Sequence, residues 1–277
     1  VPVSLFGLIG TDEKGEILEN YLFKKGIDVN LLKTDFQTIN KIRIVSKSQQ
    51  MIRLDFEKRF KREFAKKINN KITKLITDFN LVILSDYNKG SLLPQEIINL
   101  CNKNNIPTII DPKGHDFKKY TGASYLTPNI SELECVVGKI KNENSLISHS
   151  LKIVDKYQLK GILVTRSEKG VTLIEKSGLN ITYSATSKEV MDVTGAGDTF
   201  ISAFSYALAK GYKTYEAANL ANKACGIVVS RLGTATITKN ELLNIKTKLP
   251  KIFKYKDSLL KWVINKKKKN LSIVFSN

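Results

Sequence analysis

Short apolar segments alternate along the chain with longer segments in which apolar residues recur every three or four positions. The first kind is typical of buried strands and the second of helices that cover a sheet, so their order predicts an α/β fold with a mainly parallel sheet flanked by helices. We expect strands at 3–9, 81–85, 107–111, 124–127 and 161–165. Helices are expected between them; within 13–26, one helical face carries Ile17, Leu18, Tyr21 and Leu22, and Gly26 is placed to end the helix.

The segment 40–57 departs from this pattern, because apolar and polar residues alternate on both sides of a polar turn at 46–50. Such alternation predicts an antiparallel hairpin, in which Ile42 and Ile44 face the apolar residues Ile52, Leu54 and Phe56. Two interpretations stay open for it: a flap or subunit contact that stands off the main sheet, or a plain edge hairpin.

Basic residues exceed acidic ones by 19, which would suit a protein that binds nucleic acid or an anionic membrane. The lysines are spread over the whole chain, however, and the only dense run is at 265–270. This distribution is typical of solvated surface positions, and neither interleaved aromatic residues nor a helix-turn-helix pattern accompanies it. We therefore expect neither a nucleic acid nor a membrane as a partner.

Targeting signals and cysteine patterns give no reason to expect an exported protein. No run of about twenty apolar residues occurs, and the first residues read as a strand rather than a signal peptide. Cys101, Cys135 and Cys225 are widely separated, and only two histidines are present. A reducing cytoplasm with buried thiols fits this pattern better than a disulfide framework or a His-rich metal site.

Polar segments follow four predicted strands, at 85–90, 111–114, 129–132 and 166–170. Turn formation alone would explain any one of them. Because the carboxyl ends of parallel strands meet at one edge of a sheet, where ligands collect, four such segments on successive strands indicate a shared crevice.

The sequence DVTGAGDTF at 192–200 precedes a predicted helix that packs through Phe200, Ile201, Phe204 and Leu208 and ends at Gly211. Gly195, Ala196 and Gly197 carry almost no side chain, so an anion can approach their N–H groups closely at the positive end of the helix. Asp198 can then accept a proton from a hydroxyl that attacks a phosphoryl group. Two plainer alternatives remain open, a helix cap at Asp198 and a tight turn at the glycines.

The segment 192–200 resembles, position by position, the C-terminal signature of the PfkB/ribokinase family of carbohydrate kinases. Five further segments resemble the branch of heptose 7-phosphate kinases within that family: 41–57, 84–92, 111–139, 163–170 and 226–238. The resemblance runs from about residue 1 to residue 245. It implies a ribokinase-like, Rossmann-like fold with a β-hairpin lid, and ATP-dependent phosphorylation of D-glycero-β-D-manno-heptose 7-phosphate at O1 for ADP-heptose and lipopolysaccharide synthesis.

The resemblance also implies roles for individual residues. Asp198 would be the catalytic base, with Gly195, Ala196 and Gly197 as the anion hole. The residues implied for ATP are Asn129, Ile130, Ser131, Glu132, Ser167, Glu168, Gly170 and Asn222. Those implied for the sugar phosphate are Gln50, Arg53, Lys89 and Lys113. Glu132 would belong to the Mg²⁺ shell, Asp192 to a site for a monovalent cation such as K⁺, and the hairpin would form a homodimer.

Two departures from the family pattern concern the ends of the chain. The family begins with a strand and a Gly-Gly-x-x-x-Asn segment, whereas this chain has no Gly-Gly pair and matches only the end of that signature at 7–15. We expect a kinase domain at 1–249 that lacks its N-terminal part, followed at 250–277 by a basic linker and the first strand of a truncated nucleotidyltransferase domain. Alternatives are another sugar or nucleoside kinase of the family, or an inactive remnant that keeps only the fold.

Overall fold

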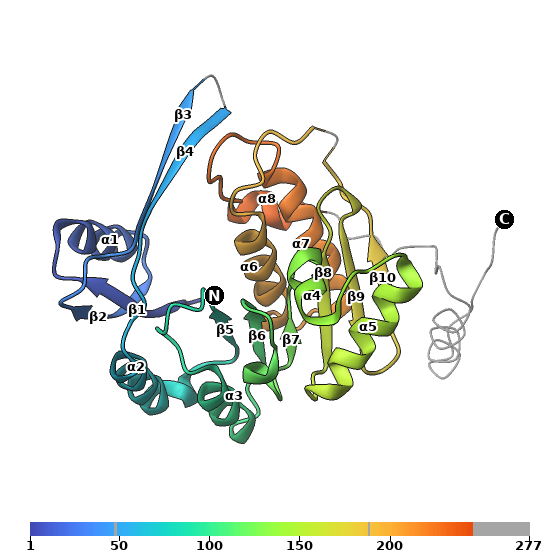
Figure 1. Ribbon diagram of the computed structural model, residues 1–277, viewed down its shortest axis with the longest axis horizontal. Coiled ribbons are helices and arrows are strands. Elements are labelled where there is room, and N and C mark those ends of the chain that lie inside the picture. Colours follow the sequence, from blue (N-terminus) through green and yellow to red (C-terminus); the bar gives the residue numbers. More distant parts are fainter. Residues whose placement is uncertain (47–48, 188, 246–277) are drawn as a thin grey trace. The chain divides into compact units, whose positions relative to one another are not determined.

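A computed structural model describes residues 1–46, 49–187 and 189–245 (Figure 1). These residues form two compact units, Val1–Phe79 with Asp86–Asn104, and Asn80–Ser85 with the described residues from Asn105 onward. The segment expected to begin a nucleotidyltransferase domain, 250–277, lies outside the described residues.

The second unit is built on a six-stranded sheet in the order β10-β9-β8-β7-β6-β5. Its strands are β5 (Val82–Ser85), β6 (Thr108–Asp111), β7 (Tyr125–Leu126), β8 (Gly161–Thr165), β9 (Val171–Glu175) and β10 (Asn180–Tyr183). Neighbouring strands from β5 to β8 are parallel, whereas β9 and β10 are antiparallel additions. The predicted mainly parallel sheet is therefore confirmed, and β9 and β10 are strands that the sequence pattern did not predict.

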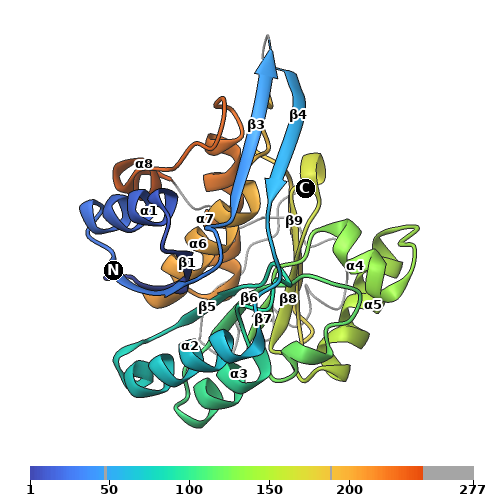
Figure 2. The same ribbon diagram turned by 60° about the vertical axis from the view of Figure 1, so that its left-hand side comes forward.

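Helices cover both faces of this sheet, as the two views in Figures 1 and 2 show. The helices are α4 (Ile130–Val137), α5 (Glu143–Lys156), α6 (Ala196–Ala209), α7 (Thr214–Val228) and the short α8 (Lys239–Asn244). One face is covered by α4 and α5, and the other by α6 and α7. Short 3-10 turns at Lys118–Tyr120 and Ser167–Lys169 follow β6 and β8.

Helix α6 is anchored to the sheet by its apolar side. Phe200, Ile201 and Phe204 are buried as predicted, and Leu208 is partly buried. The rings of Phe200 and Phe204 stack with centroids 6.2 Å apart, and Phe204 meets Tyr125 of β7 edge-on at 5.6 Å. Full burial of one such side chain contributes roughly 1.5–3 kcal/mol, so the N-terminus of α6 is held on a rigid base. The helix ends at Ala209, and Gly211, two residues beyond, has a φ of +81°.

The first unit contains a small parallel sheet of β1 (Ser4–Gly10) and β2 (Asp28–Thr34). Its helices are α1 (Glu13–Lys24), α2 (Arg62–Leu75) and α3 (Pro94–Lys103), which has proline in its first turn, and a 3-10 turn at Ile76–Asp78 follows α2. Of the predicted apolar face of α1, Ile17, Leu18 and Tyr21 are 39–60% exposed. A two-stranded sheet offers too little surface to cover that face.

The predicted hairpin is confirmed, as β3 (Asn40–Ser46) and β4 (Gln49–Phe56). Ile42 pairs with Leu54, and Ile44 pairs with Ile52, as expected from the alternation. Among the described residues the two strands form a sheet of their own, so the hairpin is not an edge of the six-stranded sheet. No helix in the described part of the chain has the length and apolarity that crossing a bilayer requires.

Candidate active site

The N-terminus of α6 is the centre of the predicted site, and Gly195 is its N-cap residue with a φ of +81°. This left-handed conformation is one that glycine adopts without the steric cost that a side chain brings. The carbonyl of Gly195 accepts the N–H of Thr199 at 2.9 Å, and Ala196 donates its own N–H to Val193 at 3.1 Å. The tight turn predicted at Gly195 is therefore present.

Gly197, in contrast, is not required by the fold. Its φ is not positive, and a Cβ built on it would meet no atom of the described residues within 4 Å, apart from its chain neighbours and its own helix backbone. Amides in the first turn of a helix have no acceptor within the helix. The open space beside Gly197 thus leaves room for an anion to reach first-turn amides, which a turn-forming role for this glycine does not explain.

Asp198 lies in the first turn of α6 and is exposed. The N-cap residue is Gly195, so Asp198 is not itself the N-cap residue, as the simple-cap alternative would require. The first turn is the positive end of the helix dipole, where negatively charged groups are favoured. Asp198 therefore has the position and charge of a proton acceptor beside an anion site.

Asp192, predicted for a cation site, joins two loops. One carboxylate oxygen accepts the N–H of Thr194 at 2.8 Å and the other accepts that of Gly233 at 3.2 Å. The N–H groups of Met191 and Asp192 both donate to the carbonyl of Val229. These contacts hold the signature against the end of α7, and a cation at Asp192 stays a prediction.

Cys225 of α7 supports the signature from within the protein. Its thiol lies 3.2 Å from the carbonyl oxygen of Ala196, and burial raises the pKa of Cys225 to about 12. The group is therefore a neutral thiol, which can donate to that carbonyl. Of the thiols that the sequence predicts to be buried, Cys101 is buried, Cys225 is half-buried and Cys135 is exposed, and the sequence does not reveal the contact of Cys225.

The predicted residues at 129–132 form the start of α4. Asn129 accepts the N–H of Glu132 at 2.8 Å, and Glu132 accepts the N–H of Asn129 at 3.0 Å, which is a capping box. Ile130 and Ser131 occupy the first turn between them. The other oxygen of Glu132 lies 2.9 Å from Nζ of Lys113. Lys113, predicted to bind the sugar phosphate, is thus placed beside the residue predicted for Mg²⁺.

The loop after β8 lies next to that capping box, because Asn129 forms a bridge with Thr165 at the end of the strand. Ser167 and Gly170 have φ values of +51° and +79°. A Cβ on Gly170 would lie 2.0 Å from the carbonyl oxygen of Tyr183, so this position requires glycine. Glu168 is exposed between them. The structure therefore brings together the two loops predicted to bind ATP.

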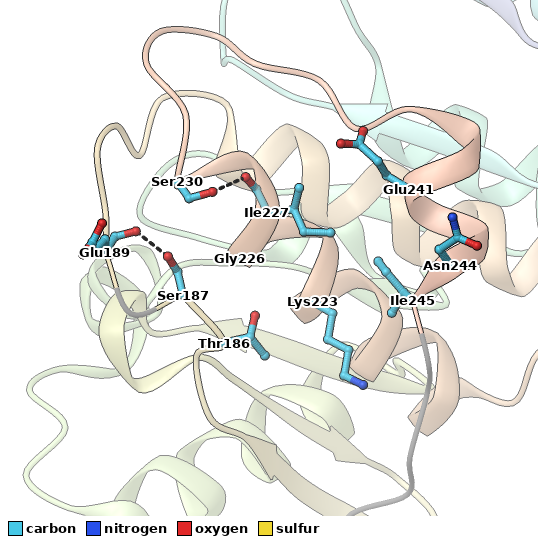
Figure 3. A pocket seen from close by; sticks show the side chains of 10 residues that line it. All are labelled: Thr186, Ser187, Glu189, Lys223, Gly226, Ile227, Ser230, Glu241, Asn244 and Ile245. Carbon is cyan, nitrogen blue, oxygen red and sulfur yellow. Dashed lines mark hydrogen bonds between the residues drawn. The ribbon is translucent and has the colours of Figure 1, made fainter.

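A pocket of about 790 Å³ opens between α7, α8 and the segment around Thr186 (Figure 3). Lys223 and Gly226 of α7 line it, and Asn222, predicted to border the nucleotide, is buried beside it and donates to the carbonyl of Ser184 at 2.8 Å. A Cβ on Gly226 would lie 2.0 Å from Oγ1 of Thr186. The sequence did not predict the residues that line this pocket. The isolated Gly226 within a predicted helix was a signal for it, because such a glycine often has a packing reason.

Glu241 is the charged residue that α8 contributes to this pocket. It accepts the N–H of Thr238 at 2.8 Å and the hydroxyl of Thr238 at 2.7 Å, and it also pairs with Arg231. The backbone N–H of Thr238 first, and then Arg231, lower the pKa of Glu241 to about 2. The carboxylate is thus ionised at neutral pH and gives the pocket lining a negative charge.

We expect Glu241→Gln to lower the Tm at pH 7, because the neutral amide loses the ion pair. A carboxylate whose pKa is lowered on folding stabilises the protein above its unfolded pKa, near 4.5, and this contribution is lost as the pH falls toward 2. Scanning fluorimetry should therefore show a Tm difference that shrinks as the pH falls below about 4.5. Lys239→Gln, on the same helix, should show no such trend, and a difference for Glu241→Gln that is constant with pH would contradict the assignment.

The cations predicted to meet the sugar phosphate in the first unit belong to one network. Glu57 pairs with Lys89, and with Lys41 at 2.9 Å; Lys41 also lies 3.4 Å from Asp55, which pairs with Arg53 at 3.1 Å. Lys89 first, and then Lys41, lower the pKa of Glu57 to about 2. Arg53 and Lys89 are therefore connected through two carboxylates. Gln50 lies in β4, and the structure does not describe its side chain.

Comparison with known proteins yields one family and a set of relatives. The profile described as pfkB family carbohydrate kinase matches residues 1–241. The chain is 47% identical over 246 residues to the bifunctional protein HldE of Haemophilus influenzae strain PittGG, and 45% identical over 246 residues to HldE of Actinobacillus pleuropneumoniae serotype 5b. Each match covers 88% of this chain and 52% of the relative, so the chain spans about half the length of these relatives.

Solved structures share the fold. Ribokinase of Thermotoga maritima matches with a TM-score of 0.71 and 22% identity, over 87% of this chain and 80% of that one. Phosphofructokinase-2 of Escherichia coli, solved with potassium, matches with a TM-score of 0.74 and 16% identity, over 88% of this chain and 81% of that one. At these identities the likeness establishes a ribokinase-like architecture.

Proposed function

The chain belongs to the pfkB family of carbohydrate kinases, and from this membership we propose that it transfers the terminal phosphoryl group of ATP to O1 of D-glycero-β-D-manno-heptose 7-phosphate. The product would be the 1,7-bisphosphate used for ADP-heptose. Identity of 45–47% to proteins named HldE supports this substrate over others of the family. The observation that carries the chemistry is the open N-terminus of α6 at Gly197, beside the exposed carboxylate of Asp198. A cytoplasmic location, where ATP is available, is part of the proposal.

In the proposed reaction, Asp198 accepts the proton of the O1 hydroxyl as that oxygen attacks the γ-phosphorus. A new oxygen–phosphorus bond forms, the bond to the leaving oxygen of ADP breaks, and the proton ends on the carboxylate. First-turn amides at Gly197 and Asp198 stabilise the negative charge on the transferring phosphoryl group. Rigid packing of α6 keeps the base and the amides in fixed geometry, so that positioning contributes to the rate.

The side chains assigned to ATP also suit a metal ion that binds together with the nucleotide. Within the described residues no three His, Cys, Asp or Glu side chains gather in a way that would hold a metal ion. Mg²⁺ commonly binds through one or two carboxylates together with the phosphates of its nucleotide, and Glu132 is the carboxylate we assign to it. When bound, Mg²⁺ neutralises charge on the phosphates. A monovalent cation such as K⁺ at Asp192 is part of the same proposal.

We assign the sugar phosphate to Gln50, Arg53, Lys89 and Lys113. Guanidinium and ammonium groups suit phosphate, and the carboxylates of Glu57 and Asp55 hold Lys89 and Arg53 in one network. ATP is assigned to the loops at 129–132 and 167–170 and to the pocket beside Asn222.

A substrate panel tests the proposal against its alternatives. ADP formation from MgATP is measured with heptose 7-phosphate, fructose 6-phosphate, ribose and a nucleoside. The highest kcat/KM is expected with heptose 7-phosphate. A higher value with another acceptor would identify another kinase of the family, and no turnover with any acceptor, although ATP binds, would identify an inactive remnant.

We further propose that two copies of the chain associate through the hairpin. Register and alternation place Ile42, Ile44, Ile52, Leu54 and Phe56 on one face of β3 and β4. These side chains are between 40% and 51% exposed, whereas the opposite face carries Lys41, Arg43, Arg53 and Asp55. An apolar sheet face of this kind suits a second copy that presents the same face.

Sedimentation velocity tests this association. The wild-type chain is expected to be a dimer at micromolar concentration, and Ile44→Asp a monomer, because a carboxylate would be buried without a partner. Arg43→Ser, on the opposite face, is the matched control and should remain dimeric. A wild-type monomer, or an Ile44→Asp variant that dimerises as well as wild type, would rule out this interface.

A further inference from the structure

The side chain of Arg166, at the junction of β8 and the loop at 167–170, is almost fully buried, with 10% exposed. Its two terminal nitrogens meet the two oxygens of Glu143 at 3.0 and 2.6 Å. Nη1 also lies 3.0 Å from Oγ1 of Thr172. A planar guanidinium that forms two parallel bonds to a carboxylate is fixed in direction as well as charge.

These contacts join elements that are distant in sequence. Glu143 lies in the first turn of α5, and Thr172 lies in β9, where its hydroxyl is 3.1 Å from that of Thr182 in β10. The Arg166 side chain is buried, whereas that of Glu143 is 37% exposed, so loss of Glu143 would leave a buried positive charge without its ion-pair partner. The position of the Arg166 side chain is therefore determined by contacts with both α5 and β9.

The backbone of Arg166 closes the loop at 167–170. Its N–H donates to the carbonyl of Gly170 at 2.8 Å, and its carbonyl accepts the N–H of Lys169 at 3.0 Å. Inside this ring, Ser167 adopts a φ of +51°, which is unfavourable for a residue other than glycine. Such a conformation persists only where the surroundings hold it, and the buried fork of Arg166 is the adjacent constraint.

From these contacts we propose that Arg166 is a positioning residue: its ion pair with Glu143 fixes the 167–170 loop in the conformation that receives ATP. This inference rests on the proposed function, which assigns ATP to that loop. Arg166 acts through the loop and not by contact with the nucleotide, because its guanidinium is engaged by Glu143 and Thr172. The sequence motifs do not predict this role, because Glu143 lies 23 residues before Arg166.

Isothermal titration with MgATP in the absence of sugar tests the proposal. Arg166→Lys keeps the charge but loses the fork, and Glu143→Gln keeps the shape but loses the charge. We expect either change to weaken ATP binding by about tenfold, equal to 1.4 kcal/mol, and to raise the KM for ATP similarly. The KM for the sugar phosphate and kcat should stay within about twofold of wild type, because the groups at α6 are unchanged. The double variant should bind ATP no more weakly than the single variant with the lower affinity, because both changes break the same ion pair.

Lys152→Ala, an exposed change on α5, is the matched control and should bind ATP as wild type does. Hydrogen exchange of the amides at 167–170 is a second measurement, and it should be faster in Arg166→Lys than in the control. A lower Tm with unchanged ATP affinity, unchanged KM for ATP and unchanged exchange would overturn the proposal and leave Arg166 a purely structural residue. A wild-type chain that binds ATP but phosphorylates no sugar would count against the proposed function, while the titration would still decide the role of Arg166.

Discussion

Asp198→Asn is expected to lower kcat for ATP-dependent phosphorylation by about 10²–10⁴-fold, while ATP affinity and Tm stay at the wild-type values. Asparagine has nearly the same shape as aspartate but cannot accept the proton of the attacking hydroxyl. Asp198 is exposed and is not the N-cap residue of α6, so the change to asparagine removes neither a buried side chain nor the N-cap residue. Initial rates, titration with MgATP and scanning fluorimetry together separate loss of chemistry from loss of fold.

Asp155→Asn is the matched control for this prediction, because it makes the same chemical change at an exposed position of α5. It should turn over at the wild-type rate. If Asp198→Asn kept wild-type turnover, the base would have to be another residue, and the proposed reaction at α6 would be wrong.

Gly197→Ala is the second change with a large expected effect, of about 10²–10³-fold in kcat, the loss that follows removal of one donor from an oxyanion hole. The methyl group would occupy the open space beside the first-turn amides, where the γ-phosphoryl group is proposed to lie. Stability should not fall, because the added Cβ meets no atom of the described residues within 4 Å other than those of its chain neighbours and its own helix backbone. Alanine in a helix interior is favoured over glycine by roughly 1 kcal/mol, so Tm should stay the same or rise.

Ser202→Ala introduces the same residue at an exposed position of the same helix and should leave kcat unchanged. Gly197→Ala with wild-type kcat would show that the phosphoryl group does not react at this helix terminus. A fall in Tm for Gly197→Ala would instead support the alternative in which this glycine serves the turn.

Elements with a strong local pattern were predictable from the sequence. Helix α6 combines an apolar side, a glycine at its start and Gly211 after its end, and the hairpin has strict alternation around a polar turn. Strands β9 and β10 were not predicted, because β9 follows β8 and β10 follows β9 through tight turns, and each depends on pairing with the strand before it. The apolar side of α1 illustrates the opposite limit, since periodicity identifies an apolar face but not what covers it.

The candidate site divides in the same way. Asp198 and Gly195 lie in one contiguous motif, and the structure confirms their placement at the start of α6. Contacts between distant segments were not predictable: Asp192 meets Gly233, and Gly226 meets Thr186, across about forty residues in each case. Such contacts arise from packing between elements, on which the spacing of residues within a single element carries no information.

Phosphorus NMR of the reaction products tests the central claim most directly. Wild-type chain incubated with MgATP and heptose 7-phosphate should produce ADP and a second phosphorus signal on the sugar, coupled to the anomeric proton at C1, whereas Asp198→Asn should produce neither in detectable amount over the same incubation. Formation of that signal by Asp198→Asn at the wild-type rate would contradict the claim that this carboxylate takes the proton of the attacking hydroxyl.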